Sequence, residues 1–76
     1  MNIEINYPSL TDTYKHYKGG LYKVITLANN TETKETMVVY QSLLFKTIFT
    51  RPLDVWNSKV KINDKEIERF KILNRI

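Results

Sequence analysis

The chain's only histidine, His16, opens the stretch "HYKGGLYKV" (residues 16–24), which also holds both glycines of the protein. An imidazole with an ordinary pKa of about 6.5 can act near neutral pH as a base, a metal ligand or a pH-dependent contact. A metal site needs three or four ligands. One histidine and no cysteine leave only carboxylates, and Asp12 is the one carboxylate close to His16 in sequence. We therefore expect no metal and no cofactor.

A catalytic role for His16 would require a nucleophile and an orienting group. No serine stands in the glycine-flanked strand-to-helix turn that exposes the nucleophile of many hydrolases. His16 is instead expected at the end of a strand, where either a structural hydrogen bond or contact with a bound ligand would suit it. We therefore expect that the protein is not an enzyme.

The pair Gly19-Gly20 fits either a phosphate-binding loop or a tight turn. Phosphate-binding loops of known types contain more glycines and lead into a helix. Here "LYKV" follows, which has the composition of a strand. The pair therefore predicts a turn that requires positive φ angles.

Tyrosines and basic residues alternate in several segments. A tyrosine on a strand is usually half-buried packing, but aromatic grooves also bind extended peptides, and single-stranded nucleic acid stacks on aromatic rings beside a basic track. The tyrosines concerned are Tyr14, Tyr17, Tyr22 and Tyr40. The basic track would consist of Lys15, Lys18, Lys23, Lys46, Arg51 and Lys59.

Arg51 and Arg69 differ chemically from the surrounding lysines. The planar guanidinium group suits bidentate pairing with a carboxylate or a phosphate. Purely structural partners would be nearby carboxylates or rings, namely Asp54, Glu68, Tyr22 and Trp56.

Four segments have the composition and alternation of β-strands. They are "YKHYK" (14–18), "LYKVITLA" (21–28), "MVVYQ" (37–41) and "LFKTIFT" (44–50). In the second, Tyr22, Val24 and Thr26 share a face. In the fourth, Phe45, Thr47 and Phe49 share a face. A turn near residues 32–34 joins the second segment to the third.

The fourth strand is expected to end at Arg51-Pro52, because proline cannot donate to a β-ladder. "PLDVW" (52–56) then predicts one helical turn with Leu53 and Trp56 facing the core. A turn is expected near Asn63-Asp64. "RFKIL" (69–73) predicts a last strand with two inward-facing side chains, Phe70 and Ile72.

These elements predict an all-β protein, a small, strongly bent antiparallel barrel of about five strands, SH3-like, with one short helical turn. A five-stranded OB barrel is the alternative, but it usually carries a helix between strands three and four, where this sequence has no amphipathic run. The 76 residues form one domain. Residues 1–12 are a lead-in segment, in which Ile3 and Ile5 alternate with polar residues and a turn follows Pro8. Residues 13–76 are the barrel.

The formal net charge is +4, and the isoelectric point is about 9.4. Such an excess attracts phosphate backbones, although lysines also serve simply to keep a small domain soluble. No apolar run approaches the roughly 20 residues of a membrane span, and the first residues do not resemble a secretion signal. We expect a cytoplasmic protein with no membrane contact. An exposed edge strand can pair two chains, so the expected state is a monomer or a weak homodimer.

The order of motifs resembles that of a small bacterial family, the domain-of-unknown-function family sixteen-fifty-three. The motifs are "YKHYKGGLYKV", "ETMVVYQSL", "TRPLDVW" and "ERFKIL", and the resemblance extends from Tyr14 to Leu73. The residues that match are Tyr14, His16, Tyr17, Lys18, Gly19, Tyr22, Val24, Val38, Val39, Tyr40, Arg51, Pro52, Leu53, Arg69 and Phe70. The resemblance implies an SH3-like barrel, and the family has no established activity.

The sequence departs from the family pattern at a few positions. Asp12-Thr13 stands where the family often has Pro-Gly, Phe49 where it often has tryptophan, and Trp56 where phenylalanine is common. Residues 1–12 have no clear counterpart.

The leading hypothesis is a non-enzymatic binding module that recognises a peptide, a protein partner or a small ligand. Its ligand-binding residues are predicted to be His16, Tyr17, Lys18, Tyr40, Arg51 and Arg69. The second hypothesis is a nucleic-acid-binding barrel that uses a basic, aromatic face. The third is a small enzyme.

Overall fold

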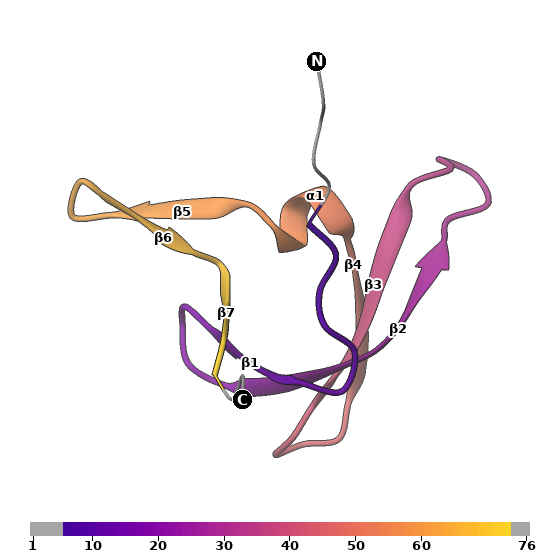
Figure 1. Ribbon diagram of the computed structural model, residues 1–76, viewed down its shortest axis with the longest axis horizontal. Coiled ribbons are helices and arrows are strands. Elements are labelled where there is room, and N and C mark those ends of the chain that lie inside the picture. Colours follow the sequence, from indigo (N-terminus) through magenta and orange to yellow (C-terminus); the bar gives the residue numbers. More distant parts are fainter. Residues whose placement is uncertain (1–5, 74–76) are drawn as a thin grey trace.

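The computed structural model describes residues 6–73, which form an antiparallel all-β fold with one short helix (Figure 1). The elements are β1 (Thr13–His16), β2 (Leu21–Asn29), β3 (Thr36–Ser42), β4 (Ile48–Pro52), α1 (Leu53–Trp56), β5 (Lys59–Ile62), β6 (Lys65–Glu68) and β7 (Phe70–Ile72). Within residues 6–73, five strands form the main sheet, in the order β4-β3-β2-β1-β7, and β5 and β6 form a separate hairpin. The predicted all-β class, antiparallel pairing and single helical turn are confirmed.

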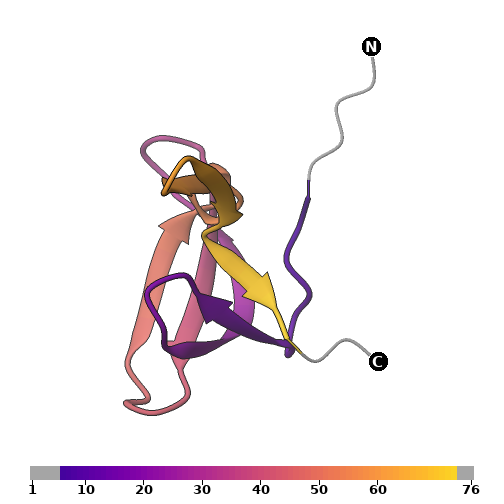
Figure 2. The ribbon, with the colours of Figure 1, turned by 90° about the vertical axis from the view of Figure 1, so that its left-hand side faces the viewer.

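The main sheet is strongly bent (Figure 2), and the long strand β2 takes part in both halves of the bend. The first residues of β2 pair with β1, and β2 also pairs with β3 along its length. A β-bulge lies between Val24 and Thr26. Bulges increase the local twist of a strand and shift its alternation. The expectation that Thr26 shares the inward face of Val24 is therefore wrong, because Leu27 takes that place against the core.

The core lies inside the bend and is rich in aromatic rings. Its buried residues are Tyr14, Val24, Val38, Tyr40, Leu53, Trp56 and Phe70. Trp56 and Phe70 stack with ring centroids 3.8 Å apart, and Tyr40 meets Trp56 edge-on at 5.0 Å. Such large rings bury much apolar area per residue, which a short chain without disulfides needs. The predicted inward positions of Phe70 and Ile72 are confirmed.

The helical turn α1 contacts β3 and β4 and contributes two residues to this core. Pro52 directly precedes it with φ −56° and ψ 143°. A proline suits this position because its missing N–H would have no helical partner there. Leu53 and Trp56 are buried three residues apart, as predicted. No helix within residues 6–73 is long and apolar enough to cross a membrane.

The predicted turns are confirmed, and each has a local cause. Gly19 and Gly20 have φ angles of 100° and 80°, which only glycine adopts without strain. In the β2–β3 turn the Asn30 side chain accepts hydrogen bonds from the backbone N–H groups of residues 32 and 33. In the β5–β6 turn Asn63 and Asp64 have φ angles of 51° and 64°. This matches the hairpin turns in which both central residues are left-handed.

The predicted start of the fourth strand at residue 44 is wrong. Leu44 and Phe45 lie in the β3–β4 turn with exposed fractions of 78% and 76%, and β4 begins at Ile48. The buried Ser42 hydroxyl accepts a hydrogen bond from the Phe45 backbone N–H at 3.0 Å, and Lys46 has a φ of 64°. The turn thus forms without glycine. The alternation of apolar and polar residues continues through it in the sequence, so the pattern does not mark where the strand begins. The expected face shared by residues 45, 47 and 49 is therefore wrong as well.

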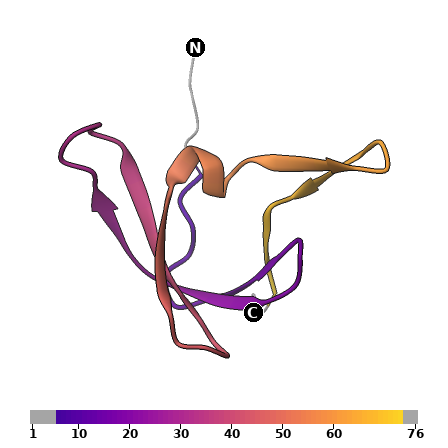
Figure 3. The same cartoon turned by 180° about the vertical axis from the view of Figure 1, so that it is seen from behind.

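The β5–β6 hairpin projects away from the main sheet (Figures 1 and 3) and raises the strand number above the expected five. Its residues are almost all exposed, although β5 alternates lysine with apolar residues. Lys59 lies opposite Glu68, and Lys61 lies opposite Glu66. Such opposite charges on neighbouring strands favour their pairing. The expected strand around residues 3 and 5 lies outside the described residues.

Truncating an inward-facing side chain of β3 should destabilise the fold far more than truncating its outward-facing neighbour. Val38 has an exposed fraction of 0%, and Val39 is only partly buried. We expect Val38→Ala to lower the free energy of unfolding by about 2 kcal/mol or more and Val39→Ala by less than about 1 kcal/mol. Urea unfolding measures both. Equal losses would contradict the assigned core face.

Candidate binding cavity between His16 and Arg51

A small cavity lies beside the aromatic core, between inward-facing side chains of five strands. Its volume is about 140 Å³, and it is lined by His16, Tyr22, Tyr40, Phe49, Arg51 and Phe70. The strand register explains the grouping. His16 lies opposite Phe70, Tyr40 lies opposite Phe49, and Arg51 is two residues beyond Phe49 on the same face of β4. The alternation of side chains along the strands therefore places these residues on the same face of the sheet.

Arg51 is held against the cavity wall by two contacts. Its Nε donates a hydrogen bond to the Tyr40 hydroxyl at 3.2 Å, and its guanidinium carbon lies 5.4 Å from the centre of the Phe70 ring. A guanidinium group over an aromatic face is stabilised by the ring quadrupole. The bond to Tyr40 uses Nε, and within residues 6–73 no acceptor is bound to the terminal nitrogens of Arg51.

His16 lies between rings and cations. Its ring centroid is 4.8 Å from that of Phe70 and 4.6 Å from that of Tyr17. Nδ1 accepts a hydrogen bond from the backbone N–H of Lys18 at 3.2 Å, so the proton of the neutral ring belongs on Nε2. Burial lowers the pKa of His16 below its usual 6.5, and the charges of Arg51, Arg69 and Lys18 lower it further. His16 is therefore mainly neutral at pH 7.

The other predicted site residues border the cavity without lining it. Tyr17 is half-buried beside His16, and the charged groups of both Arg69 and Lys18 lie 5.7 Å from the centre of its ring. Tyr17 and His16 also line a neighbouring groove of about 360 Å³ between β1, β6 and β7. The structure thus brings His16, Tyr40 and Arg51 into one cavity and places Tyr17, Lys18 and Arg69 on its rim.

Arg69 also has a structural role at the base of the β5–β6 hairpin. Its Nε donates to the Ser58 hydroxyl at 2.9 Å, and its backbone N–H donates to the Ser58 carbonyl oxygen at 3.2 Å. Its own carbonyl oxygen accepts from the backbone N–H of Tyr17 at 3.0 Å. Neither Arg51 nor Arg69 directs its Nε to the carboxylates considered from the sequence. The rings beneath the two guanidinium groups are Phe70 and Tyr17.

Three residues that line the cavity are not among the predicted site residues: Tyr22, Phe49 and Phe70. Their inward positions follow from strand alternation, but their convergence depends on how the sheet bends. Tyr22 is the central ring, at centroid distances of 5.5 Å from Tyr40 and 6.3 Å from Phe49. Strand alternation could have indicated these three residues, because each lies on the same face of the sheet as a predicted site residue.

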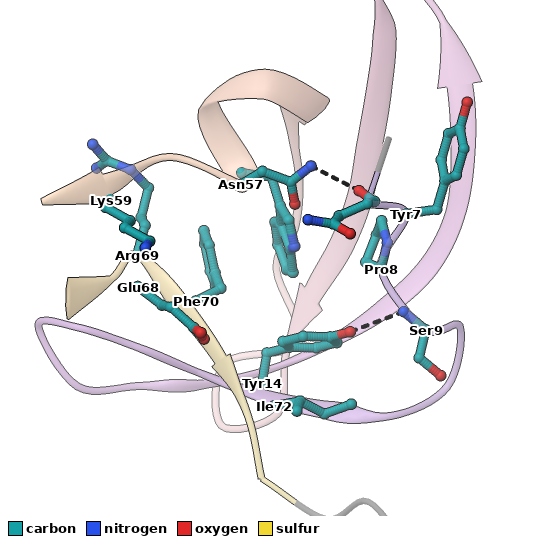
Figure 4. A pocket seen from close by; sticks show the side chains of 12 residues that line it. Tyr7, Pro8, Ser9, Tyr14, Asn57, Lys59, Glu68, Arg69, Phe70 and Ile72 are labelled. Carbon is teal, nitrogen blue, oxygen red and sulfur yellow. Dashed lines mark hydrogen bonds between the residues drawn. The ribbon is translucent and has the colours of Figure 1, made fainter. Parts of the chain in front are cut away.

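A second hollow, of about 310 Å³, lies between residues 6–9 and the side of the domain formed by α1 and β7 (Figure 4). Here the Ser9 backbone N–H donates to the Tyr14 hydroxyl at 2.8 Å, and the Asn57 side chain donates to the Asn6 carbonyl oxygen at 2.7 Å. These bonds attach the segment before β1 to the domain. Within residues 6–73, no three histidine, cysteine or carboxylate side chains are grouped so that they could hold a metal ion.

The fold and the cavity define a small all-β domain with an aromatic and basic hollow beside its core. The sequence profile of a family described as protein of unknown function (DUF1653) matches residues 12–72. The protein belongs to this family. Its structure is similar to the crystal structure of a family member from Bordetella bronchiseptica, with a TM-score of 0.74, 33% sequence identity, and coverage of 87% of this chain and 88% of that chain. Comparison with curated proteins gave no match.

The glycine pair offers a test of how the cavity wall is positioned. A Cβ atom on Gly20 would lie 3.1 Å from the Tyr22 ring, whereas one on Gly19 would meet nothing within 4 Å. Both positions have positive φ, so we expect each alanine variant to lose about 1 to 2 kcal/mol of stability. Only Gly20→Ala should also shift the NMR signals of the Tyr22 ring. The same shifts in Gly19→Ala would contradict this arrangement.

The lowered pKa of His16 predicts a pH dependence of stability. The unfolded chain binds a proton at about pH 6.5, before the folded protein does, so stability should fall as the pH drops from about 6.5 through the folded pKa. NMR titration of the ring should give a midpoint below 6.5, and Arg51→Gln should raise that midpoint. A midpoint at or above 6.5 in the wild type would be inconsistent with the contacts described.

Proposed function

We propose that the protein is a non-enzymatic binding module that docks a peptide, a protein partner or a small ligand at this cavity. The observation that supports this most strongly is the convergence of His16, Tyr40 and Arg51 on one cavity, with further rings in its wall. Tyr17, Lys18 and Arg69 surround it as an aromatic and basic rim. Aromatic residues and arginine are also the residue types most enriched at binding hot spots.

The chemistry of the cavity favours binding over catalysis. Its lining includes no serine, cysteine, aspartate or glutamate, which are the usual nucleophiles and orienting groups beside a catalytic histidine. Nδ1 of His16 already accepts a backbone hydrogen bond, and the nearest charges are positive. The hydroxyl of Tyr40 accepts from Arg51. The polar groups of His16, Tyr40 and Arg51 are thus suited to hold a ligand group in place and not to transfer a proton or attack a bond.

The size of the cavity suggests how a ligand would bind. A volume of about 140 Å³ accommodates one small group, not a whole drug-sized molecule. The rest of the ligand would lie over the rim, where Tyr17 is flanked by Arg69 and Lys18. This favours a ligand that inserts one group and contacts the rim with the rest.

A nucleic-acid strand is the second candidate ligand. The observation in its favour is the half-buried Tyr17 ring with two cationic groups 5.7 Å from its centre, in a chain of net charge +4. Stacking of one base on such a ring is worth about 1 to 3 kcal/mol. Binding of this kind would weaken steeply with salt, with a logarithmic slope of about 0.7 per neutralised phosphate of a single strand.

A ligand panel followed by amide NMR shifts tests the proposal. The panel contains proline-rich peptides, acidic peptides, small organic acids and bases, and a single-stranded oligothymidylate at two salt concentrations. We expect at least one class to give saturable shifts centred on His16, Tyr40 and Arg51. Lys23, on the outer face of the sheet, should stay unchanged and serve as an internal control.

Absence of saturable shifts for every class, or shifts centred on the outer face, would contradict the proposed docking site. Shifts produced only by the oligonucleotide, and lost at high salt, would replace the first candidate with the second. The same titration of the Arg51→Gln variant shows whether the cavity itself takes part.

A further inference from the structure

We infer that the cavity between His16 and Arg51 binds a single carboxylate group carried on an apolar part of a ligand. This inference rests on the proposed function and names the chemistry of the inserted group. The supporting features are the charge of the cavity, the presentation of the Arg51 guanidinium, and the apolar character of the remaining wall.

The charges exclude a cation as the inserted group. A cavity walled by rings can hold an ammonium group by cation–π attraction. In this cavity, however, Arg51 already lies over the Phe70 ring, and the lining includes no carboxylate. Arg69 and Lys18 add positive charge close to His16. A second cation would meet only repulsion, whereas an anion would be attracted by all three charged groups.

The guanidinium group of Arg51 is presented in a fixed orientation. The hydrogen bond from Nε to Tyr40 and the contact with the Phe70 face restrain the side chain from two directions. Its two terminal nitrogens form the edge that pairs with a carboxylate through two parallel hydrogen bonds. Because the side chain is already ordered, little conformational entropy is lost when the anion binds.

A carboxylate suits this cavity better than a phosphate. The cavity contains one guanidinium group, and most of its wall consists of the rings of Tyr22, Tyr40, Phe49 and Phe70. A phosphate ester carries a charge of about −1.5 to −2 and three strong acceptor oxygens. Transfer of unpaired charge and acceptors into an apolar wall is costly. One carboxylate matches one guanidinium in charge and in donor number, and its apolar carrier can contact the rings.

His16 would link this binding to pH. The groups that face it are Arg51 from β4, Arg69 from the bend before β7, Lys18 from the β1–β2 turn, and the rings of Tyr17, Tyr22 and Phe70. On its other side, Lys15, Glu68 and Lys71 line the neighbouring groove together with it. A bound carboxylate offsets these positive charges and so raises the pKa of His16. The complex then holds more protons than the free protein between the two pKa values. Affinity should therefore increase as the pH falls through that window.

The test compares four probes built on one benzene ring: benzoate, benzamide, benzylammonium and phenyl phosphate. Each is titrated into the protein at pH 6 while amide and histidine ring signals are followed. We expect benzoate to shift the signals of His16, Tyr22, Phe49 and Arg51 with a dissociation constant on the order of 1 mM. The other three probes should bind at least about tenfold more weakly. The pKa of His16 should rise when benzoate is bound.

Two variants show whether benzoate binding depends on the charge of Arg51 or on the net charge of the protein. Arg51→Gln should weaken benzoate binding by about tenfold or more, because it removes a charge-assisted pair of hydrogen bonds. Lys23→Gln removes the same unit of charge from the outer face of β2 and should leave the affinity within about twofold. An amide spectrum of Arg51→Gln that retains the wild-type dispersion shows that its fold is intact. If it does not, the comparison of the four probes on the wild type decides alone.

The outcomes separate this inference from the proposed function. Benzamide or benzylammonium binding as tightly as benzoate, or phenyl phosphate binding more tightly, would overturn the carboxylate assignment. So would benzoate binding that Lys23→Gln weakens as much as Arg51→Gln. Failure of benzoate while another ligand class still shifts the cavity residues would also overturn it, and would leave the docking site standing. Failure of every class would remove both proposals.

Discussion

Contact between side chains across the bend is the constraint on which this small fold depends. The main sheet ends in β4 on one side and β7 on the other, and within residues 6–73 no β-ladder joins these two edges. Arg51 from β4 lies over the ring of Phe70 from β7, and Tyr40 from β3 meets Phe70 edge-on with centroids 5.5 Å apart. Trp56 from α1 stacks on the Phe70 ring. The rings therefore hold the bend where backbone hydrogen bonds do not.

This arrangement also explains why the candidate site lies where it does. The interior of so small a bent sheet is filled by a few side chains from each strand. Trp56, Leu53 and the two valines of the core are buried and pack together. At the cavity the inward positions are occupied by His16 and Arg51, which are only partly buried and keep polar groups accessible. The residues that leave the interior incompletely filled are thus the ones on which the proposed binding site rests.

The sequence predicted the elements better than it predicted their convergence. Strand alternation and glycine, proline and asparagine signals identified most strands, the helical turn and several turns, because these depend on local preferences. The β3–β4 turn was missed since Ser42 and Lys46 form it without glycine. Of the β5–β6 hairpin only the turn at Asn63-Asp64 was predicted, because its strands are almost fully exposed and pair opposite charges. Of the site, His16, Tyr40 and Arg51 were identified from residue type. The wall formed by Tyr22, Phe49 and Phe70 follows from the bend of the sheet, which no local pattern specifies.

The contact between Arg51 and the rings of Phe70 and Tyr40 is the part of this account on which both the fold and the site depend. Nuclear Overhauser effects between the Arg51 side chain and these rings test it most directly. The account predicts cross-peaks from the Arg51 δ-methylene and Nε protons to both rings, with the δ protons shifted upfield by the Phe70 face. Arg51 protons at random-coil positions, without cross-peaks to either ring, would contradict it.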